Sequence, residues 1–150
     1  MTEGPILIQW VDDRDVPLAE ISLVRAHREG LLHRIAVVYL VGETGDILIQ
    51  ERADGRLDHS AAGHVDPGES YETAAKRELL EEIGVKAKNL LLVTSGVSEE
   101  RYREEFIRHV YTVYELVGMP GVISPEEVRR VFWANPFDVY IDMKDDLLDK

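Results

Sequence analysis

Three glutamates stand close together in the stretch GHVDPGESYETAAKRELLEEIGV, residues 63–85. Glu78, Glu81 and Glu82 are three and four positions apart, so a helix would place their carboxylates on one side. Like charges at this spacing repel each other. A divalent cation reverses that effect, because Mg2+ and Mn2+ bind carboxylate oxygens and need few protein ligands when substrate phosphates complete their shell. The alternative is an acidic helix face that points into solvent.

A helix at this place would position the three carboxylates. The sequence predicts that it begins near Ser70, a good N-cap residue, and ends at Gly84, which can adopt the left-handed conformation. Glu72 falls in the first turn, where the helix dipole favours negative charge. A short strand near residues 60–65 precedes the helix, and the turn DPGES ends that strand. The apolar residues on the flank beside the glutamates are Ala75, Leu79 and Ile83.

Strand-like stretches fill most of the remaining chain. Residues 34–41 and 47–52 predict a hairpin closed by the turn GETGD. Further strands are predicted at residues 6–11, 19–24, 87–97, 106–117 and 127–133. A terminal helix is predicted from Asn135, with Pro136 at its first position. Interleaved strands and two helices predict an α/β fold in which helices pack on a mixed sheet, and the absence of a linker predicts a single domain over residues 1–150.

The composition restricts the classes of partner. The chain has 17 Lys plus Arg against 29 Asp plus Glu, a net charge of -12, which argues against binding of a large nucleic acid. A small phosphorylated substrate remains compatible if a metal ion supplies positive charge. The chain has no cysteine, which excludes disulfides, zinc thiolate sites and a thiol nucleophile. The start lacks the pattern of a signal peptide and there is no long apolar run, so we expect a soluble, cytoplasmic protein without a membrane partner.

The glutamates belong to a longer pattern, G-x5-E-x7-R-E-U-x-E-E-x-G-U, in which U is aliphatic. This pattern resembles the signature of Nudix hydrolases, and every position matches. The resemblance implies the Nudix fold, an α/β/α sandwich with a mixed β-sheet between helices. It also implies cleavage of a diphosphate linked to another moiety X. The matching residues are Gly63, Glu69, Arg77, Glu78, Leu79, Glu81, Glu82, Gly84 and Val85.

The resemblance implies a role for each residue of the pattern. The metal-binding and catalytic carboxylates would be Glu78, Glu81 and Glu82. The carbonyl of Gly63 would be a further metal ligand. Arg77 is included in the catalytic set. Together with Glu69 it would hold the loop and the helix in place, and Gly84 would also support the site. The cofactor would be Mg2+ (or Mn2+), and metal-activated water would be the nucleophile. Which glutamate accepts the proton, which phosphorus is attacked and how many ions bind are left open.

The expected substrate is a small diphosphate-containing molecule, such as a nucleoside-diphosphate derivative. Three arginines before the helix are candidates for bidentate contacts to its phosphates, with an ordinary surface role as the alternative; they are Arg34, Arg52 and Arg56. Residues 98–106, SEERYREEF, are interpreted as a polar loop at a position where Nudix proteins often carry specificity elements. The sequence does not decide whether the chain forms a homodimer.

A second, weaker resemblance lies outside the signature. The segments WVDDRDVPLAEI, RAHREGLLHRIAVVYLV and DHSAAGHV are similar to the isopentenyl-diphosphate isomerase branch of the same superfamily. In that branch His33 and His64 match histidines that bind a metal, and His27 lies near a third. The alternative for each is a structural role, for example a hydrogen bond to a backbone carbonyl. His59 and His109 have no support from a motif, and ordinary structural roles are expected for them.

Isomerase activity is nevertheless disfavoured. That branch uses a cysteine and a glutamate on opposite faces of the substrate, and this chain has Ala62 where the cysteine of CGH is expected. Ile107 and His109 stand where the isomerases have acidic residues. The third hypothesis is a noncatalytic, Nudix-like ligand sensor. The intact set of carboxylates counts against it, because a sensor need not retain all three.

Overall fold

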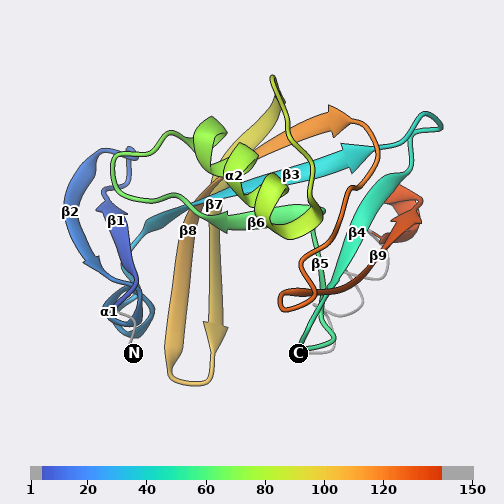
Figure 1. Ribbon diagram of the computed structural model, residues 1–150. Helices are drawn as coiled ribbons and strands as arrows, with labels where there is room; N and C mark the ends of the chain where they lie inside the picture. Colours follow the sequence, from blue (N-terminus) through green and yellow to red (C-terminus); the bar gives the residue numbers. More distant parts are fainter. Residues whose placement is uncertain (1–4, 140–150) are drawn as a thin grey trace.

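The computed structural model describes residues 5–139. In that part of the chain nine strands form one mixed sheet that curls around β3 (Figure 1). The elements are β1 Leu7–Val11, β2 Pro17–Ser22, α1 Leu23–Glu29, β3 His33–Val41, β4 Ile47–Arg52, β5 Leu57–Asp58, β6 Ala61–His64, α2 Tyr71–Ile83, β7 Leu91–Tyr102, β8 Glu105–Val117 and β9 Val128–Ala134.

Strand β3 is the centre of the sheet because it is apolar on both faces. It pairs in parallel with β8 along its whole length, from His33 opposite His109 to Val41 opposite Val117. It also pairs antiparallel with β6, where Ile35 lies opposite His64. Strands β1 and β4 join β3 near its two ends. The parallel pairing brings together two strands that are far apart in the sequence.

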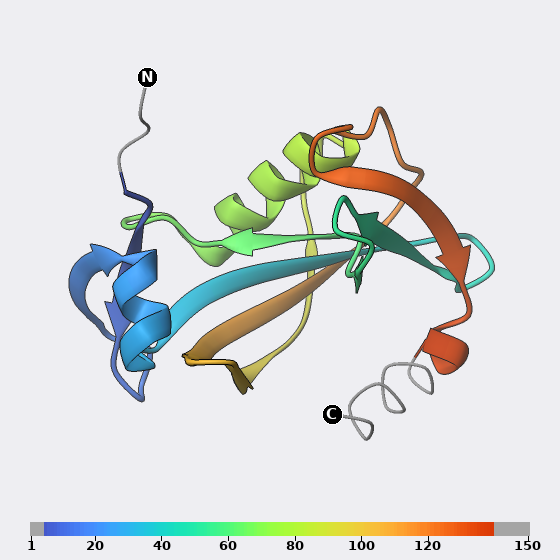
Figure 2. The same cartoon turned by 90° about the horizontal axis from the view of Figure 1, so that it is seen from below.

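Helix α2 lies across one face of this sheet (Figure 2). Its apolar side is fully buried, in a core shared with β3, β4 and β6. The Ser70 hydroxyl accepts a hydrogen bond from the Thr73 N–H at 3.1 Å, and Gly84 ends the helix in the left-handed conformation with φ of 68°. The predicted limits of this helix and the predicted α/β class with a mixed sheet are confirmed. The buried apolar residues of the helix are Ala74, Ala75, Leu79 and Ile83.

Helix α1 was not among the predicted elements. Ser22 caps its start by accepting from the Arg25 N–H at 3.2 Å, and Gly30 ends it with φ of 67°. The helix has only seven residues and a mostly polar sequence, so it lacks a clear apolar period. Packing stabilises it, because Ala26 is buried against Ile8 and Ile21 of the β1–β2 hairpin.

The interpretation of residues 98–106 as a loop is wrong. Strand β7 continues to Tyr102, and β8 begins at Glu105, so the segment is the end of a long hairpin that extends beyond the rest of the sheet (Figure 1). Cross-strand contacts stabilise this polar ladder. The Arg108 Nε donates to Glu99 at 3.1 Å, and the Arg101 guanidinium lies 4.2 Å from the centre of the Phe106 ring.

The predicted terminal helix begins as expected. Asn135 caps it, since its side-chain oxygen accepts from the Phe137 N–H at 2.9 Å and its carbonyl accepts from the Val139 N–H at 3.1 Å. The rest of that prediction lies outside the described residues. Within residues 5–139, no helix combines the length and the apolar character that crossing a bilayer requires.

Candidate active site

Two carboxylates of α2 face each other at the inner side of the helix. Glu82 is 6% exposed, and its oxygens accept hydrogen bonds from the Gln50 side-chain amide at 2.9 Å and from the Ala62 N–H at 3.3 Å. Burial and the adjacent Glu78 carboxylate together raise the pKa of Glu82 to about 8. Burial also raises the pKa of Glu78. This pair is therefore an unfavourable arrangement for two negative charges without a cation.

The backbone of β6 approaches Glu78 very closely. A Cβ atom at Gly63 would overlap the carboxyl group of Glu78, so glycine allows the strand and the helix to come together at this point. The approach brings the main chain of Gly63 beside the carboxylate pair. This close approach explains why the signature has glycine at position 63, which the sequence alone did not show.

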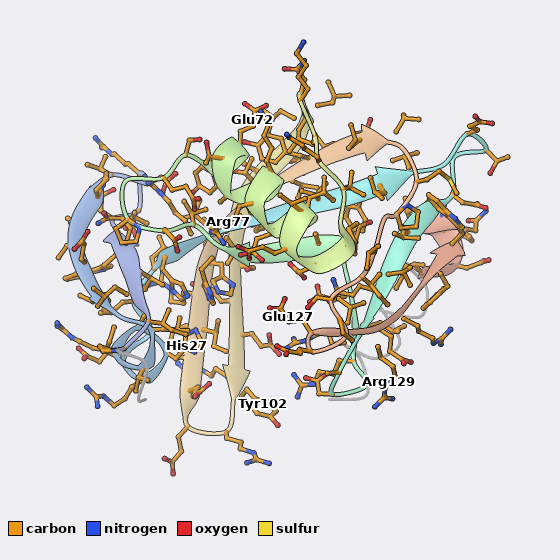
Figure 3. The ribbon with its side chains drawn as sticks, in the orientation of Figure 1. His27, Glu72, Arg77, Tyr102, Glu127 and Arg129 are labelled. Carbon is orange, nitrogen blue, oxygen red and sulfur yellow. The ribbon has the colours of Figure 1, made fainter. Side chains whose placement is uncertain are left out.

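Arg77 connects the helix to the loop that precedes it. Its guanidinium donates to both oxygens of Glu69, at 2.9 and 3.0 Å, to the His64 carbonyl at 3.0 Å and to Glu78 at 2.6 Å. The hydrogen bonds from Arg77 hold the pKa of Glu69 below its usual range. Glu69 in turn accepts from the Asp66 N–H at 3.0 Å. Figure 3 shows Arg77 on the side of α2 that faces β6.

Glu81 lies at the edge of this arrangement. Its side chain is 53% exposed, and one oxygen lies 3.7 Å from a terminal nitrogen of Arg77. The structure therefore brings Gly63, Glu78 and Glu82 together and leaves Glu81 at the rim. Carboxylate and backbone carbonyl oxygens are the donors that hard cations such as Mg2+ prefer, so Glu78, Glu82 and the main chain of Gly63 fit the predicted ion.

A cleft of about 720 Å³ opens beside the carboxylate pair. Its volume is in the range of sites that hold a small molecule. The charged residues of the lining are mainly acidic, and they include Glu127, which Figure 3 shows on the loop that precedes β9. Phosphates that enter this cleft would meet net negative charge unless a cation accompanies them. The charged lining residues are Asp54, Asp58, Asp66, Glu78, Glu82, Glu126 and Glu127, against Arg52 and Arg77.

Four histidines form a second cluster, which borders the cleft. The predicted pair His33 and His64 lies together with His27 and His109, and one ring nitrogen of each lies within 4.8 Å of the others. Burial lowers the pKa of His33 to about 4 and that of His109 to about 3, and it also lowers the pKa of His64. The lowered pKa values favour the neutral form of His33, His64 and His109 at physiological pH. His59 is not part of this cluster and instead contacts Asp58 at 2.7 Å.

The sequence did not indicate that His109 belongs to the histidine cluster. The signal exists only in three dimensions, since the parallel pairing of β3 and β8 places His109 directly opposite His33. His27 comes from α1, the helix that the sequence pattern did not predict.

The family comparison agrees with the glutamate site. A NUDIX domain profile matches residues 31–149. The chain belongs to the Nudix family. Membership of this family explains both the fold and the signature. The chain is a Nudix-type pyrophosphohydrolase.

Relatives of this Nudix chain include members of both predicted branches. It is 31% identical over 139 residues to an isopentenyl-diphosphate Delta-isomerase of Burkholderia multivorans, which covers 89% of this chain and 77% of the isomerase. It is 28% identical over 143 residues to an uncharacterised Nudix hydrolase of Yersinia pestis, with 89% and 76% covered. Among solved structures, DR0079 from Deinococcus radiodurans matches with a TM-score of 0.71 at 22% identity, covering 93% of this chain and 88% of the other. The similarity to Nudix hydrolases and to the isomerase branch is confirmed.

The three arginines that were predicted to contact substrate differ in their position relative to the cleft and in their partners. Arg34 forms an ion pair with Asp15 at 2.7 Å and is largely buried, so its charge is already compensated. Arg52 lines the cleft and lies 3.6 Å from Asp54. Arg56 is exposed and stacks over the Tyr102 ring at 5.3 Å. Of the three, Arg52 is the one whose place suits a contact with substrate.

Proposed function

We propose that this chain hydrolyses the diphosphate linkage of a small nucleoside-diphosphate derivative or a related small diphosphate, with Mg2+ (or Mn2+) as cofactor. The observation that carries the proposal is the pairing of the largely buried Glu78 with the buried Glu82 beside Gly63, on the wall of the cleft. Two adjacent carboxylates with little solvent are destabilising unless a proton or a cation compensates their charge. A divalent cation supplies that compensation and also suits a diphosphate substrate.

Each side chain of the site has a task in this reaction. Glu78, Glu82 and the Gly63 carbonyl would hold the ion, and Glu81 would complete the set from the rim. When bound, the ion supplies charge neutralisation for the diphosphate and lowers the pKa of the attacking water. Gln50 fixes the orientation of Glu82 through its 2.9 Å hydrogen bond.

Proton transfer and positioning complete the mechanism. One of the three glutamates of the signature, Glu78, Glu81 or Glu82, accepts the proton of the water. The water oxygen then attacks phosphorus opposite the departing group. Arg77 keeps Glu78 and the 66–69 loop in place through its contacts with Glu78, Glu69 and the His64 carbonyl. The products are two phosphate-containing fragments, and no covalent enzyme intermediate is needed.

The cleft favours small substrates over polymers. Its acidic lining and the net charge of -12 oppose binding of a long polyanion. Arg52 is the lining cation best placed to contact a phosphate that lies away from the ion.

The test is a substrate panel with identified products. Nucleotide sugars, dinucleotides, nucleoside di- and triphosphates and isoprenyl diphosphates are incubated with the protein and Mg2+ or Mn2+. The proposal expects hydrolysis of at least one nucleoside-diphosphate derivative, and full loss of turnover when a chelator removes the divalent ions. Turnover that persists with the chelator would overturn the metal requirement.

Isomerisation of an isoprenyl diphosphate is the second candidate, because relatives that are 31% identical carry that name. The chain has no cysteine and has Ala62 on the cleft wall, so a thiol cannot protonate or deprotonate the substrate. The same panel distinguishes the candidates. A double-bond isomer without phosphate release would favour the isomerase, and binding without turnover would favour a ligand sensor.

A further inference from the structure

His59 is a residue of the cleft that the glutamate mechanism does not use. It lies between β5 and β6, and both His59 and its neighbour Asp58 line the cleft that contains Glu78 and Glu82. The His59 side chain is 32% exposed and that of Asp58 is 27% exposed, so the pair borders the cleft without being sealed in the core. A ligand that binds in the cleft can therefore reach this pair.

Asp58 holds one nitrogen of the His59 ring. Its Oδ1 lies 2.7 Å from His59 Nδ1 and also accepts from the His59 backbone N–H at 2.7 Å. Burial raises the pKa of Asp58, but the hydrogen bonds from His59 outweigh that effect and hold the pKa below its usual range. An ionised carboxylate can only accept hydrogen bonds, so Nδ1 carries the hydrogen. Nε2 is then the nitrogen that can exchange a proton with a ligand.

Tyr39 of β3 packs against the same imidazole. The two rings meet edge to face, with centres 5.3 Å apart and planes at 72°. Burial, and to a lesser degree Asp58, raises the pKa of Tyr39 to about 12, so near neutral pH this ring contributes packing without charge. Of the cations that line the cleft, Arg52 at the end of β4 is close enough to help lower the pKa of Asp58. The orientation of His59 is thus set by a carboxylate and an aromatic ring.

The strand register connects this pair to the glutamate site. Asp58 of β5 lies directly opposite Gln50 of β4, and residues in such a pair project from the same face of a sheet. Gln50 is 2% exposed and donates to the Glu82 carboxylate at 2.9 Å and to the Ser60 carbonyl at 3.1 Å. Only the side chains of Asp58 and Gln50 separate His59 from Glu82, so one small molecule in the cleft can contact both.

The cleavage step creates a demand for a proton at the departing oxygen. Water attacks phosphorus and gives its proton to a glutamate, and the bond between phosphorus and the bridging oxygen breaks. The bridging oxygen leaves with the bonding electron pair, on the side of phosphorus opposite the attack. A proton donor at that position stabilises the developing negative charge, and histidine is the side chain that most readily donates a proton near neutral pH.

We propose that His59 is the general acid that protonates the departing oxygen and that Asp58 is its positioning residue, an inference that rests on the proposed hydrolysis. The proton passes from Nε2 of the imidazolium to the bridging oxygen as its bond to phosphorus breaks. Nδ1 keeps its hydrogen bond to Asp58, and solvent returns a proton to Nε2 after the products leave. The imidazolium also supplies positive charge in a cleft whose charged lining is mainly acidic.

The kinetic test compares His59→Gln with the unaltered protein on a nucleoside-diphosphate substrate at saturating Mg2+. Loss of the acid should lower kcat by about 100-fold and change KM by less than about threefold, because the proton moves in the transition state. In the unaltered protein kcat should fall at alkaline pH as His59 loses its proton, and this alkaline limb should be absent from His59→Gln. Asp58→Asn should lower kcat by about tenfold and displace the limb to lower pH, because the imidazolium loses its compensating charge.

Chemical rescue distinguishes catalysis from a structural role of the ring. Imidazole added in solution should restore part of the kcat of His59→Gly, whereas a ring that only packs would not be replaced in this way. The control for Asp58→Asn is Asp46→Asn, since Asp46 precedes β4 at the end away from Arg52 and is not among the residues that line the cleft. It should keep the alkaline limb and a kcat within about twofold of the unaltered protein.

Binding is followed independently of turnover. A nucleoside imidodiphosphate, in which nitrogen replaces the bridging oxygen and prevents hydrolysis, is added with Mg2+. The imidazole NMR signals of His59, identified by their loss in His59→Gln, should shift when this analogue binds. The inference is overturned if folded His59→Gln keeps the kcat and the alkaline limb of the unaltered protein, or if the analogue binds without shifting these signals.

Failure of the proposed function gives a different result. Turnover that persists in chelator yet still requires His59 would contradict the metal requirement and leave the role of His59 standing. If the unaltered protein hydrolyses no diphosphate of the panel, the proposed function and this inference are both overturned.

Discussion

Two clusters of side chains whose chemistry suits metal binding meet at neighbouring residues of β6. Gly63 lies against the glutamates of α2, while His64 belongs to the histidine cluster. The first group presents carboxylates at the wall of an open cleft, with Glu82 buried and the Glu78 side chain 14% exposed. The second presents imidazole nitrogens from four elements, with three of those nitrogens buried. The two clusters differ in donor type, since carboxylate oxygens suit hard cations such as Mg2+ and imidazole nitrogens suit transition metals.

The largest effect should come from Glu82→Gln. The amide keeps the size of the side chain but neither binds a cation well nor accepts a proton, so we expect hydrolysis to fall by about 100- to 10,000-fold. Initial rates with Mg2+ measure this. The matched control is Glu72→Gln on the same helix, where the Glu72 side chain is 45% exposed and pairs only weakly with Lys76 at 3.7 Å. Similar losses of activity in the two variants would contradict the assignment of Glu82 to the active site.

Arg77→Lys should have the next largest effect, on stability. Lysine cannot reproduce the two hydrogen bonds to Glu69 together with those to the His64 carbonyl and Glu78, so the free energy of unfolding should fall by about 1–3 kcal/mol. Urea unfolding monitored by circular dichroism measures it. Arg25→Lys is the control, since Arg25 pairs with Glu29 on the surface and should change stability by at most about 0.5 kcal/mol. Equal values would mean that Arg77 does not brace the site.

The smallest effect concerns the metal-free histidine cluster. His109→Leu removes a buried nitrogen that has no hydrogen-bond partner in the described residues, so the free energy of unfolding in chelator should rise by about 0.5–1.5 kcal/mol. His59→Leu should instead lower stability, because it breaks the 2.7 Å contact with Asp58. A lower stability of metal-free His109→Leu would show that the four rings serve packing.

The contrast between the two groups also explains what the sequence could predict. The glutamates lie within one helix, so local periodicity and the caps at Ser70 and Gly84 were enough to place them. The sequence could not show that Glu82 is buried while Glu81 is exposed, because the sheet beneath the helix causes that difference. His109 reaches His33 only through a parallel pairing between distant strands, which no local pattern encodes.

The most direct test of the account is the dependence of hydrolysis on divalent metal in the unaltered protein. The initial rate of diphosphate cleavage is measured against free Mg2+ concentration in protein that has been stripped of metals. The account predicts no turnover without added metal and a rate that rises with Mg2+ to saturation. Turnover by the metal-free protein that does not respond to Mg2+ would contradict it.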